Sequence, residues 1–380
     1  MLQQWQNKMK IGVPKEVKDQ EARVAITPEG VASLVRSGNR VVVEVNAGIG
    51  SGFSNEQYQQ AGADMVATAE AWNADLVVKV KEPQESEYQY LGSQMVFTFF
   101  HLAGVAKSLT EALIYKGTTA LAYESLEDEN GRLPILAPMS AVAGNMSVLM
   151  GAYYLARFNR GNGMQLGIIL NKSYGKVVII GDGIVGQHAA KVASAMGTHV
   201  TIVGLDEARW LKQHKELLPE VSFVKSDKEN ISRLITGADL VVGAVLCRGA
   251  RAPKLITEKM LKTMQSGSVI VDVSIDQGGC FETSRPTTHT DPVYIIDGVT
   301  HYCVSNMPGA YPKASTIALT DATIEYIHEL AEDGLNGFIS DKGKMKAINV
   351  FRRKIVSTKV ASDLGMLDWY EAMEDIVFDK

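Results

Sequence analysis

The sequence predicts an α/β protein with two doubly wound parallel-sheet domains that face each other across a cleft. Three observations support this fold class. The chain has 380 residues, more than one hydrophobic core usually organises. Continuous apolar runs alternate with capped helical segments, as in parallel sheets covered on both faces. A glycine-rich turn at residues 181–186 joins a strand pattern to a helix pattern.

Composition narrows the function classes. Hydrophobic residues make up 46% and charged residues 21%, and the formal net charge is −5. These values argue against a nucleic-acid or anionic-membrane partner. The three cysteines, Cys247, Cys280 and Cys303, have no metal-ligand spacing, so we expect reduced thiols, no metal site and a cytoplasmic location. Residues 1–8 have no apolar signal core, and we expect them to be an extension before a first strand.

Apolar runs give the expected strands. In the first third they are residues 10–14, 40–45, 75–80, 95–100 and 118–124. A second set, which we expect to form another parallel sheet, comprises residues 176–181, 199–204, 239–245, 268–274, 293–298 and 301–306.

Capping residues mark the early helices. Thr27 precedes a proline at a first helical position, and Gly38 ends that helix. Ser54 and Gln57 have the spacing of a capping box, and Gly62 closes the second helix.

Residues 135–156 are uncharged for 22 positions, long enough to span a bilayer. A proline, an asparagine, serines and glycines within the run favour a buried helix capped at Ser140 instead. After residue 311 the pattern becomes helical, with a start expected at Ser315 and an end at Gly334. We expect this tail to pack back on the first domain. The expected domains are therefore residues 1–135 (first part of the substrate domain), 136–310 (nucleotide domain) and 311–380 (C-terminal part of the substrate domain).

Gly181, Gly183 and Gly186 form a dinucleotide fingerprint of the Rossmann type, followed by Ile184 and Val185 at the helix start. The first glycine allows the tight turn, the second lets the backbone approach a pyrophosphate, and the third allows close helix–strand packing. The helix N-terminus then offers free N–H groups to the phosphates.

The acidic residue that usually holds the ribose is missing. The second strand of the fingerprint ends at Gly204, and Asp206 lies two residues on. Either Asp206 replaces the acid, or its loss leaves room for a 2′-phosphate near Arg209. We favour NAD, with NADP left open. Asp206 could also serve only as a helix cap, which is compatible with either cofactor.

Four ionisable residues follow strands: Arg23, Lys81, His101 and Asp276. Ligands of open α/β sheets collect at the carboxyl ends of the strands, so these side chains could clamp a small anionic substrate and move its protons. Each also has a structural interpretation. Arg23 could pair with Glu16 or Glu21 at the surface, and Lys81 could be a solvated charge. His101 could be a satisfied core histidine, and Asp276 could cap a turn.

Considered together, these residues lie in a series of motifs that resembles the bacterial alanine dehydrogenase family from about residue 10 to 335. Its most diagnostic run is "VDVSIDQGGCFETSRPTT" (271–288). The other matching runs are "IGVPKE", "RVAITPEGV", "LVVKVKEP", "TFFHLA", "LAPMSAVAG", "GDGIVG", "ADLVVGAVL", "APKLIT", "YCVSNMPGAYPKAST" and "ALTDATIEYIHELA".

The resemblance implies reversible, NAD-dependent oxidative deamination of L-alanine to pyruvate and ammonium by a homo-hexamer. It assigns Arg23 to the substrate carboxylate, Lys81 to the carboxylate or carbonyl, and His101 and Asp276 to catalysis. A guanidinium fork suits a carboxylate, and an imidazole exchanges protons near neutral pH. The resemblance also places Ser140, Asn306 and Met307 along the nucleotide cleft.

The sequence departs from the family pattern in two places, and three other functions compete with the one that the resemblance implies. Gly204 departs from the family pattern, and so does the linker at residues 158–176, which could alter a hinge loop or an oligomer contact. The rivals are the nucleotide-binding component of a proton-translocating transhydrogenase, an inactive cofactor sensor, and a dehydrogenase for another small amino acid. The presence of all four ionisable residues argues against the first two.

Overall fold

A computed structural model describes residues 9–214, 218, 220–246 and 251–378. Residues 1–8 and Cys247 therefore lie outside the described part. The chain divides into two compact units, with boundaries between Met139 and Ser140 and between Ala310 and Tyr311. Unit 1 consists of the described residues up to Met139 and from Tyr311 onward. Unit 2 consists of those from Ser140 to Ala310.

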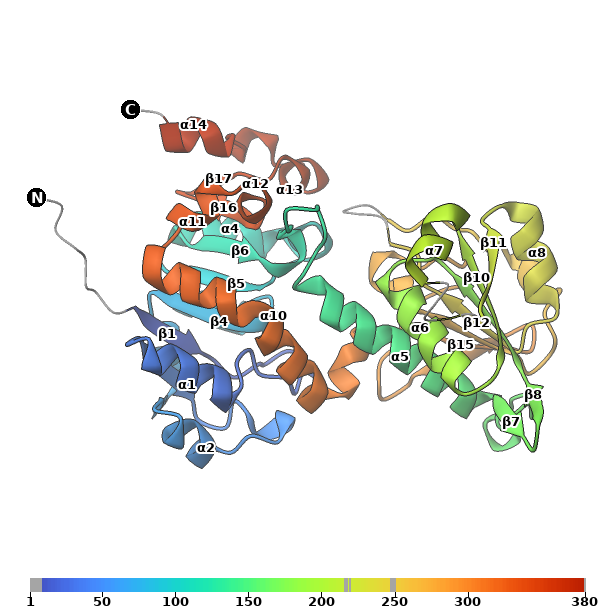
Figure 1. Ribbon diagram of the computed structural model, residues 1–380. Helices are drawn as coiled ribbons and strands as arrows, with labels where there is room; N and C mark the ends of the chain where they lie inside the picture. The colour runs from blue at the N-terminus through green and yellow to red at the C-terminus, as the bar shows by residue number, and fades with distance from the viewer. Residues whose placement is uncertain (1–8, 215–217, 219, 247–250, 379–380) are drawn as a thin grey trace, which may run out of the picture. The chain divides into compact units, whose positions relative to one another are not determined.

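Unit 1 is built on a mixed, mainly parallel sheet of eight strands among the described residues, in the order β17-β16-β6-β5-β4-β1-β2-β3 (Figure 1). Its strands are β1 (Lys10–Val13), β2 (Arg40–Glu44), β3 (Asp64–Val66), β4 (Leu76–Lys81), β5 (Met95–Phe99), β6 (Thr119–Ala122), β16 (Ile348–Phe351) and β17 (Lys354–Ile355). Its helices are α1 (Pro28–Arg36), α2 (Asn55–Gln60), α3 (Thr68–Trp72), α4 (Lys107–Lys116), α10 (Pro312–Asp333), α11 (Asn336–Ser340), α12 (Lys342–Met345), α13 (Thr358–Asp363) and α14 (Met373–Phe378).

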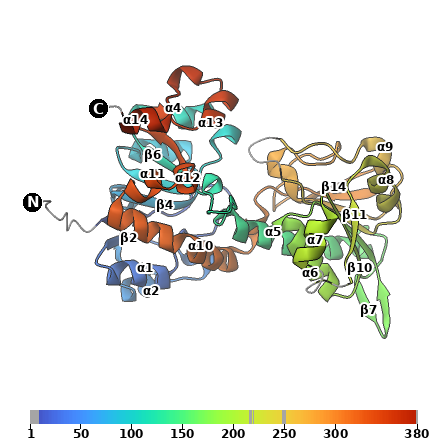
Figure 2. The ribbon, with the colours of Figure 1, turned by 45° about the horizontal axis from the view of Figure 1, so that its top comes forward.

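Alternate residues of the strands enter two separate cores, because both faces of this sheet are covered. On one face, Val78 and Val80 of β4 pack in a cluster with residues of α1 and α10. On the other, Val77 packs in a cluster with residues of α3, α4 and α13. Helix α10, from the end of the chain, thus lies beside α1 from its beginning (Figure 2).

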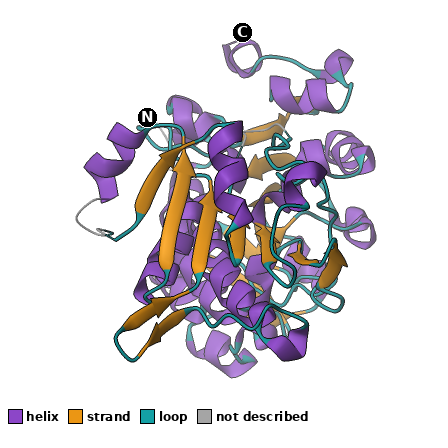
Figure 3. Cartoon of the chain, turned by 90° about the vertical axis from the view of Figure 1, so that its right-hand side faces the viewer, coloured by secondary structure: helices purple, strands orange, loops and turns teal. Residues whose placement is uncertain are grey.

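Unit 2 is built on a second sheet, in the order β11-β10-β9-β12-β13-β15-β14 among the described residues. Figure 3 shows the strands of the chain in orange and the helices in purple. Its strands are β9 (Lys176–Ile180), β10 (His199–Gly204), β11 (Ser222–Lys225), β12 (Leu240–Gly243), β13 (Val269–Asp272), β14 (Val293–Ile296) and β15 (Val299–Tyr302). Its helices are α6 (Ile184–Ala195), α7 (Glu207–His214), α8 (Lys228–Thr236) and α9 (Glu258–Leu261). A separate hairpin of β7 (Gly167–Ile169) and β8 (Lys172–Tyr174) extends from the unit (Figures 1 and 2).

The predicted α/β class is confirmed, with antiparallel exceptions at the sheet edges. β14 pairs antiparallel with β15, and β16 pairs antiparallel with β6 and β17. The sequence analysis expected a helical tail, so it missed β16 and β17. These strands are short and stand at an edge, where few residues record the alternation that identifies a strand.

Helix caps were predicted well where a side chain supplies the cap. Thr27 accepts a hydrogen bond from the Gly30 N–H, and Ser54 with Gln57 forms the expected capping box. The expected starts at Ser140 and Ser315 are wrong, since α5 (Leu136–Leu155) and α10 begin earlier, at Leu136 and Pro312. In both cases a proline in the first turn is compatible with the helix, because the first N–H groups need no intrahelical partner.

Helix α5 is buried on one side only. Met146 and Val148 are buried in the core of unit 2, whereas Leu149 and Tyr153 are exposed. Among the helices of the described residues, none is long and apolar enough to cross a membrane.

Candidate active site

Three of the predicted site residues come together in unit 1. Arg23 lies in the loop after β1, Lys81 is the last residue of β4, and His101 follows β5. These strands are neighbours in the sheet and run parallel, and Lys81 is paired with Phe99, two residues before His101. Because parallel strands end at the same edge, the three side chains lie at one edge of the sheet, where open α/β sheets bind ligands.

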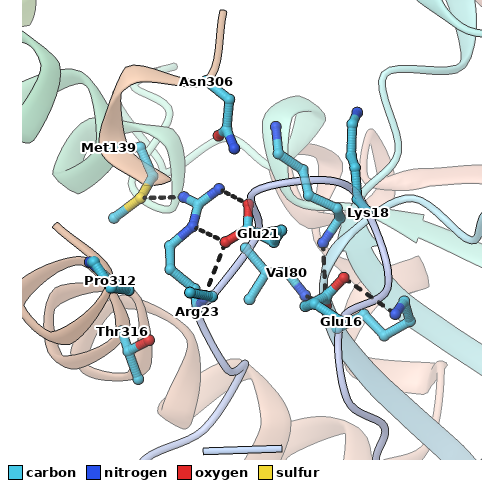
Figure 4. Close-up of polar contacts among 12 residues, drawn as sticks. Glu16, Lys18, Glu21, Arg23, Val80, Met139, Asn306, Pro312 and Thr316 are labelled. Carbon is cyan, nitrogen blue, oxygen red and sulfur yellow. Dashed lines mark hydrogen bonds and ion pairs between the residues drawn. The ribbon is translucent and has the colours of Figure 1, made fainter. Parts of the chain in front are cut away.

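The Arg23 guanidinium is buried and held by Glu21 (Figure 4). Arg23 Nε donates to Glu21 Oε1 at 2.7 Å, and Nη2 donates to Oε2 at 2.5 Å. Its Nη1 also contacts Met139 Sδ at 3.1 Å. The partner suggested by the sequence, Glu21, is therefore correct, but the surface location is wrong. This pairing fixes the plane of the guanidinium fork, a group whose geometry suits a carboxylate.

A buried ion cluster behind Lys81 was missed by the sequence analysis. Lys79 is fully buried and its Nζ lies 3.1 Å from Glu16 Oε2 and 2.9 Å from Glu87 Oε1. Glu16 Oε1 also accepts from the backbone N–H of Val80 at 2.6 Å and of Lys81 at 3.4 Å. Glu16 therefore ties the loop after β1 to the end of β4. The available signal was a lysine in the middle of the apolar strand "LVVKV".

The charges of this cluster shift its pKa values. Burial raises the pKa of Glu16, although Lys79 and the Val80 N–H oppose that effect. Burial alone would lower the pKa of Lys79, but the carboxylates of Glu16 and Glu87 outweigh it and the pKa is raised. Both directions follow from two carboxylates sharing one ammonium group in a desolvated site.

His101 is exposed and is not a core histidine. Its φ is +47°, in the left-handed region, and its side chain is 45% exposed. The His101 and Phe100 N–H groups donate to the two oxygens of Glu124 at 2.6 and 3.2 Å. The ring stacks on Phe99, and its Nδ1 lies 3.9 Å from Glu124 Oε1. Glu124 thus holds the loop in a conformation that presents the imidazole to solvent.

Asp276 is exposed in unit 2, on the short 3₁₀ segment Val273–Gln277 that follows β13. The cap that the alternative interpretation assigned to Asp276 is supplied by Asp272, whose side chain accepts from the Ser274 N–H. Asp272 also accepts from the Cys280 N–H at 2.9 Å and from Ser284 Oγ at 2.6 Å. This fully buried carboxylate therefore organises the whole loop that carries Asp276, and its burial raises its pKa.

The three glycine positions of the fingerprint differ in whether the surrounding protein leaves room for a side chain. Gly181 has a φ of +118°, and a Cβ there would lie 2.4 Å from the Ala244 carbonyl oxygen. A Cβ on Gly186 would lie 2.0 Å from the Gly181 carbonyl oxygen. At Gly183, which precedes α6, a Cβ would meet nothing within 4 Å. Protein packing thus explains two glycines, and the open space at Gly183 fits a bound pyrophosphate.

The loop lies where the strand order reverses, because β9 stands between β10 and β12. This switch point is the usual binding site for nucleotides in doubly wound sheets. Ile184 is exposed and Val185 half-buried at the start of α6. Asn306 follows β15 with a φ of +60°, and Met307 is buried at the start of the 3₁₀ segment Met307–Ala310. Ser140 is half-buried in α5.

At the end of β10, Asp206 caps α7 by accepting from the Arg209 N–H at 2.9 Å. The helix cap considered for Asp206 is therefore present, and it is compatible with either cofactor. The sequence analysis missed Asp182, whose Oδ2 lies 2.7 Å from Arg209 Nη2. Asp182 stands between Gly181 and Gly183, at a position that the fingerprint leaves unspecified.

Replacing Gly183 with alanine tests whether the glycine-rich turn at residues 181–186 forms a cradle for the pyrophosphate. Because the new Cβ meets no protein atom, we expect the melting temperature to stay within about 2 °C of wild type, whereas NADH binding should weaken at least about tenfold. Differential scanning fluorimetry and nicotinamide fluorescence titration measure the two quantities. Gly186→Ala is the matched comparison and should lower the melting temperature, since its Cβ collides with backbone. Unchanged NADH affinity in Gly183→Ala would contradict the proposed cradle.

The two sets of residues define the chain as a two-unit dinucleotide-binding protein of the oxidoreductase type. Within the described residues, no group of three or more His, Cys, Asp or Glu side chains could hold a metal ion. Residues 12–143 match the family model "Alanine dehydrogenase/PNT, N-terminal domain", and residues 147–358 match the C-terminal domain of the same family. The chain belongs to the alanine dehydrogenase/PNT family.

Individual relatives agree with this assignment. The chain is 46% identical to "Alanine dehydrogenase 2" of Staphylococcus aureus (strain USA300), over 97% of this chain and 99% of that protein. It is 45% identical to alanine dehydrogenase of Staphylococcus epidermidis over the same shares. A solved L-alanine dehydrogenase superposes with a TM-score of 0.90 at 44% identity, covering 94% of this chain and 100% of that one. A transhydrogenase from Sinorhizobium meliloti, 24% identical with a TM-score of 0.80, shares the fold over 91% of this chain and 100% of that one.

Proposed function

We propose that this protein is an NAD-dependent L-alanine dehydrogenase, which reversibly converts L-alanine, NAD and water to pyruvate, ammonium and NADH. The observation that supports this most is the placement of Arg23, Lys81 and His101 at one edge of one sheet. Near-full-length relatives named alanine dehydrogenases support the same reaction. We assign substrate binding and the candidate base His101 to unit 1, and NAD binding and the second candidate, Asp276, to unit 2.

In the proposed reaction, NAD supplies a hydride acceptor for the substrate Cα. Arg23 binds the substrate carboxylate through the guanidinium that Glu21 orients. Lys81 contacts the carboxylate or carbonyl oxygen from the end of β4. Both residues place the Cα for transfer, and orientation of this kind is a large part of catalysis.

Proton transfer falls to His101 or Asp276. Loss of the hydride from the substrate Cα leaves an imine. When water adds to the imine carbon, the imidazole of His101 or the carboxylate of Asp276 accepts the proton of that water. Asp276 also stabilises the positive charge that develops on the substrate nitrogen. We propose that Ser140, Asn306 and Met307 line the nucleotide site and that the assembly is a cytoplasmic homo-hexamer.

The direct test is the initial rate of NADH formation from L-alanine and NAD, followed at the absorbance of reduced nicotinamide. Glycine and L-serine in place of L-alanine test the other small amino acids. Rates with L-alanine well above those with glycine and L-serine support the proposal. NADH binding without turnover of any of the three amino acids would refute it and would favour a cofactor sensor.

Replacing Arg23 with lysine should raise the KM for pyruvate by about tenfold or more, while the Kd for NADH stays unchanged. Lysine keeps the charge but loses the planar fork that binds a carboxylate in a bidentate manner. Steady-state kinetics in the reductive direction and fluorescence titration of NADH measure the two values. An unchanged KM for pyruvate would remove Arg23 from the substrate site. Arg40→Lys, at an exposed pair in the same unit, is the control.

A further inference from the structure

The missing acid at the end of β10 has a structural counterpart in the glycine loop. A Cβ added to Gly204 would lie 2.8 Å from both Cγ and Oδ2 of Asp182. It would also lie 2.7 Å from a ring carbon of Phe223. The carboxylate of Asp182 therefore occupies the space into which a side chain at position 204 would extend. Gly204 is required here because another residue already supplies an acid at this point.

The Asp182 side chain is held in place by its neighbours. It is 13% exposed, and its Oδ2 lies 2.7 Å from Nη2 of Arg209. Gln187 Nε2 donates to the Asp182 carbonyl oxygen at 3.1 Å, which fixes the backbone of the loop. A carboxylate has about four acceptor positions, so an ion pair with Arg209 still allows it to accept ribose hydroxyl groups.

We propose that Asp182, and not Asp206, binds the adenosine ribose hydroxyls and thereby selects NAD over NADP. This inference rests on the proposed function only in that it requires a dinucleotide in unit 2. A carboxylate at this position accepts hydrogen bonds from the hydroxyls and repels a 2′-phosphate. Arg209, which alone would favour a phosphate, has its charge balanced by Asp182. Asp206 is exposed and already caps α7.

Direct binding tests the assignment without turnover. The dissociation constants of NADH and NADPH are measured by nicotinamide fluorescence on the full-length protein without substrate. Wild type should bind NADH at least about tenfold more tightly than NADPH. Asp182→Asn and Asp182→Ala should weaken NADH binding by about tenfold to a hundredfold, as expected for hydrogen bonds to a charged group. Both should also strengthen NADPH binding, because Arg209 is then unbalanced.

Moving the carboxylate from position 182 to position 204 tests which position holds the acid that binds the ribose. Gly204→Asp alone should weaken NADH binding, because its Cβ displaces the Asp182 carboxylate. The double variant Asp182→Ala/Gly204→Asp should bind NADH more tightly than either single variant, since the acid then stands at the end of β10 and only the Phe223 ring has to shift. Asp227→Asn is the matched control, because Asp227 caps α8 after the neighbouring strand. It should leave both constants unchanged, and circular dichroism verifies folding of each variant.

Three outcomes would overturn the inference. The first is wild-type NADH affinity in Asp182→Ala. The second is a larger loss in Asp206→Asn than in Asp182→Asn. The third is tighter binding of NADPH than of NADH by wild type, which would assign Arg209 to a 2′-phosphate. In the first two cases the proposed function stands unchanged, and in the third its amino-acid substrate stands but its cofactor becomes NADP. Binding of neither cofactor would overturn both proposals.

Discussion

Replacing His101 with asparagine is expected to lower kcat for L-alanine by about 10²–10⁴-fold and to leave the Kd for NADH unchanged. This range is typical for the loss of a general acid or base. Asparagine is the appropriate replacement because the left-handed φ of His101 is tolerated by asparagine much better than by most residues. The variant thus removes the imidazole while the loop held by Glu124 stays in place. Steady-state kinetics and fluorescence titration give the two values.

A matched control is His328→Asn. His328 lies in α10 of the same unit, where its Nε2 hydrogen-bonds to Ser33 Oγ at 2.8 Å, and kcat should be unaffected. A kcat within about threefold of wild type for His101→Asn would leave Asp276 as the remaining candidate for proton transfer. The kcat of the Asp276→Asn variant then tests that remaining candidate.

Replacing Lys79 with methionine should destabilise the protein by about 3–5 kcal/mol, the range for breaking a buried ion pair by removing one partner. The substitution preserves much of the side-chain length but leaves Glu16 and Glu87 buried without their counterion. Glu16 also holds the N–H groups of Val80 and Lys81, so we expect the end of β4 to loosen. Urea unfolding followed by circular dichroism measures the free energy of unfolding.

Two comparisons separate the causes of this loss. Lys346→Met removes an ammonium group from an exposed pair with Glu127, and it should cost less than about 1 kcal/mol. The double variant Lys79→Met/Glu87→Gln should be more stable than Lys79→Met, because one uncompensated carboxylate is removed. A loss for Lys79→Met as small as that for Lys346→Met would show that the cluster stays hydrated or protonated when the lysine is absent.

The sequence indicates the fold where the local pattern and the tertiary contacts agree. The runs at β4, β5, β9 and β12 are mostly apolar because both sheet faces are covered, so their positions could be predicted. The pairing of β16 with β6 could not be predicted, because it joins segments more than 200 residues apart and includes a register shift. The helix start at Pro312 has a proline at the first position and no hydrogen bond from a capping side chain, so a search for a capping serine missed it.

The candidate site likewise contains residues that could be predicted from the sequence and residues that could not. Arg23, Lys81 and His101 could be proposed from the sequence because each follows an expected strand. Their supports, Glu21, Glu16 and Glu124, could not be assigned, since which carboxylate meets which donor depends on loop conformation. Asp182 was missed for a related reason. The fingerprint describes its position only as a spacer, and the direction of its side chain is set by the absence of a side chain at Gly204.

The buried carboxylate of Asp272 limits how the loop after β13 can change. Ser274, Cys280 and Ser284 all donate to it, and a Cβ at Gly279 would lie 2.5 Å from its Oδ2. The N–H groups of Ser274 and Cys280 survive a side-chain replacement. The side chains of Cys280 and Ser284 and a Cβ at Gly279 all meet this one carboxylate, so substitutions at these three positions should be strongly non-additive. For anyone who reshapes the substrate specificity of this protein, the loop is a single mutational unit. Asp276 has to be kept for its proposed catalytic role, whereas Gly279, Cys280 and Ser284 have to be kept or replaced together.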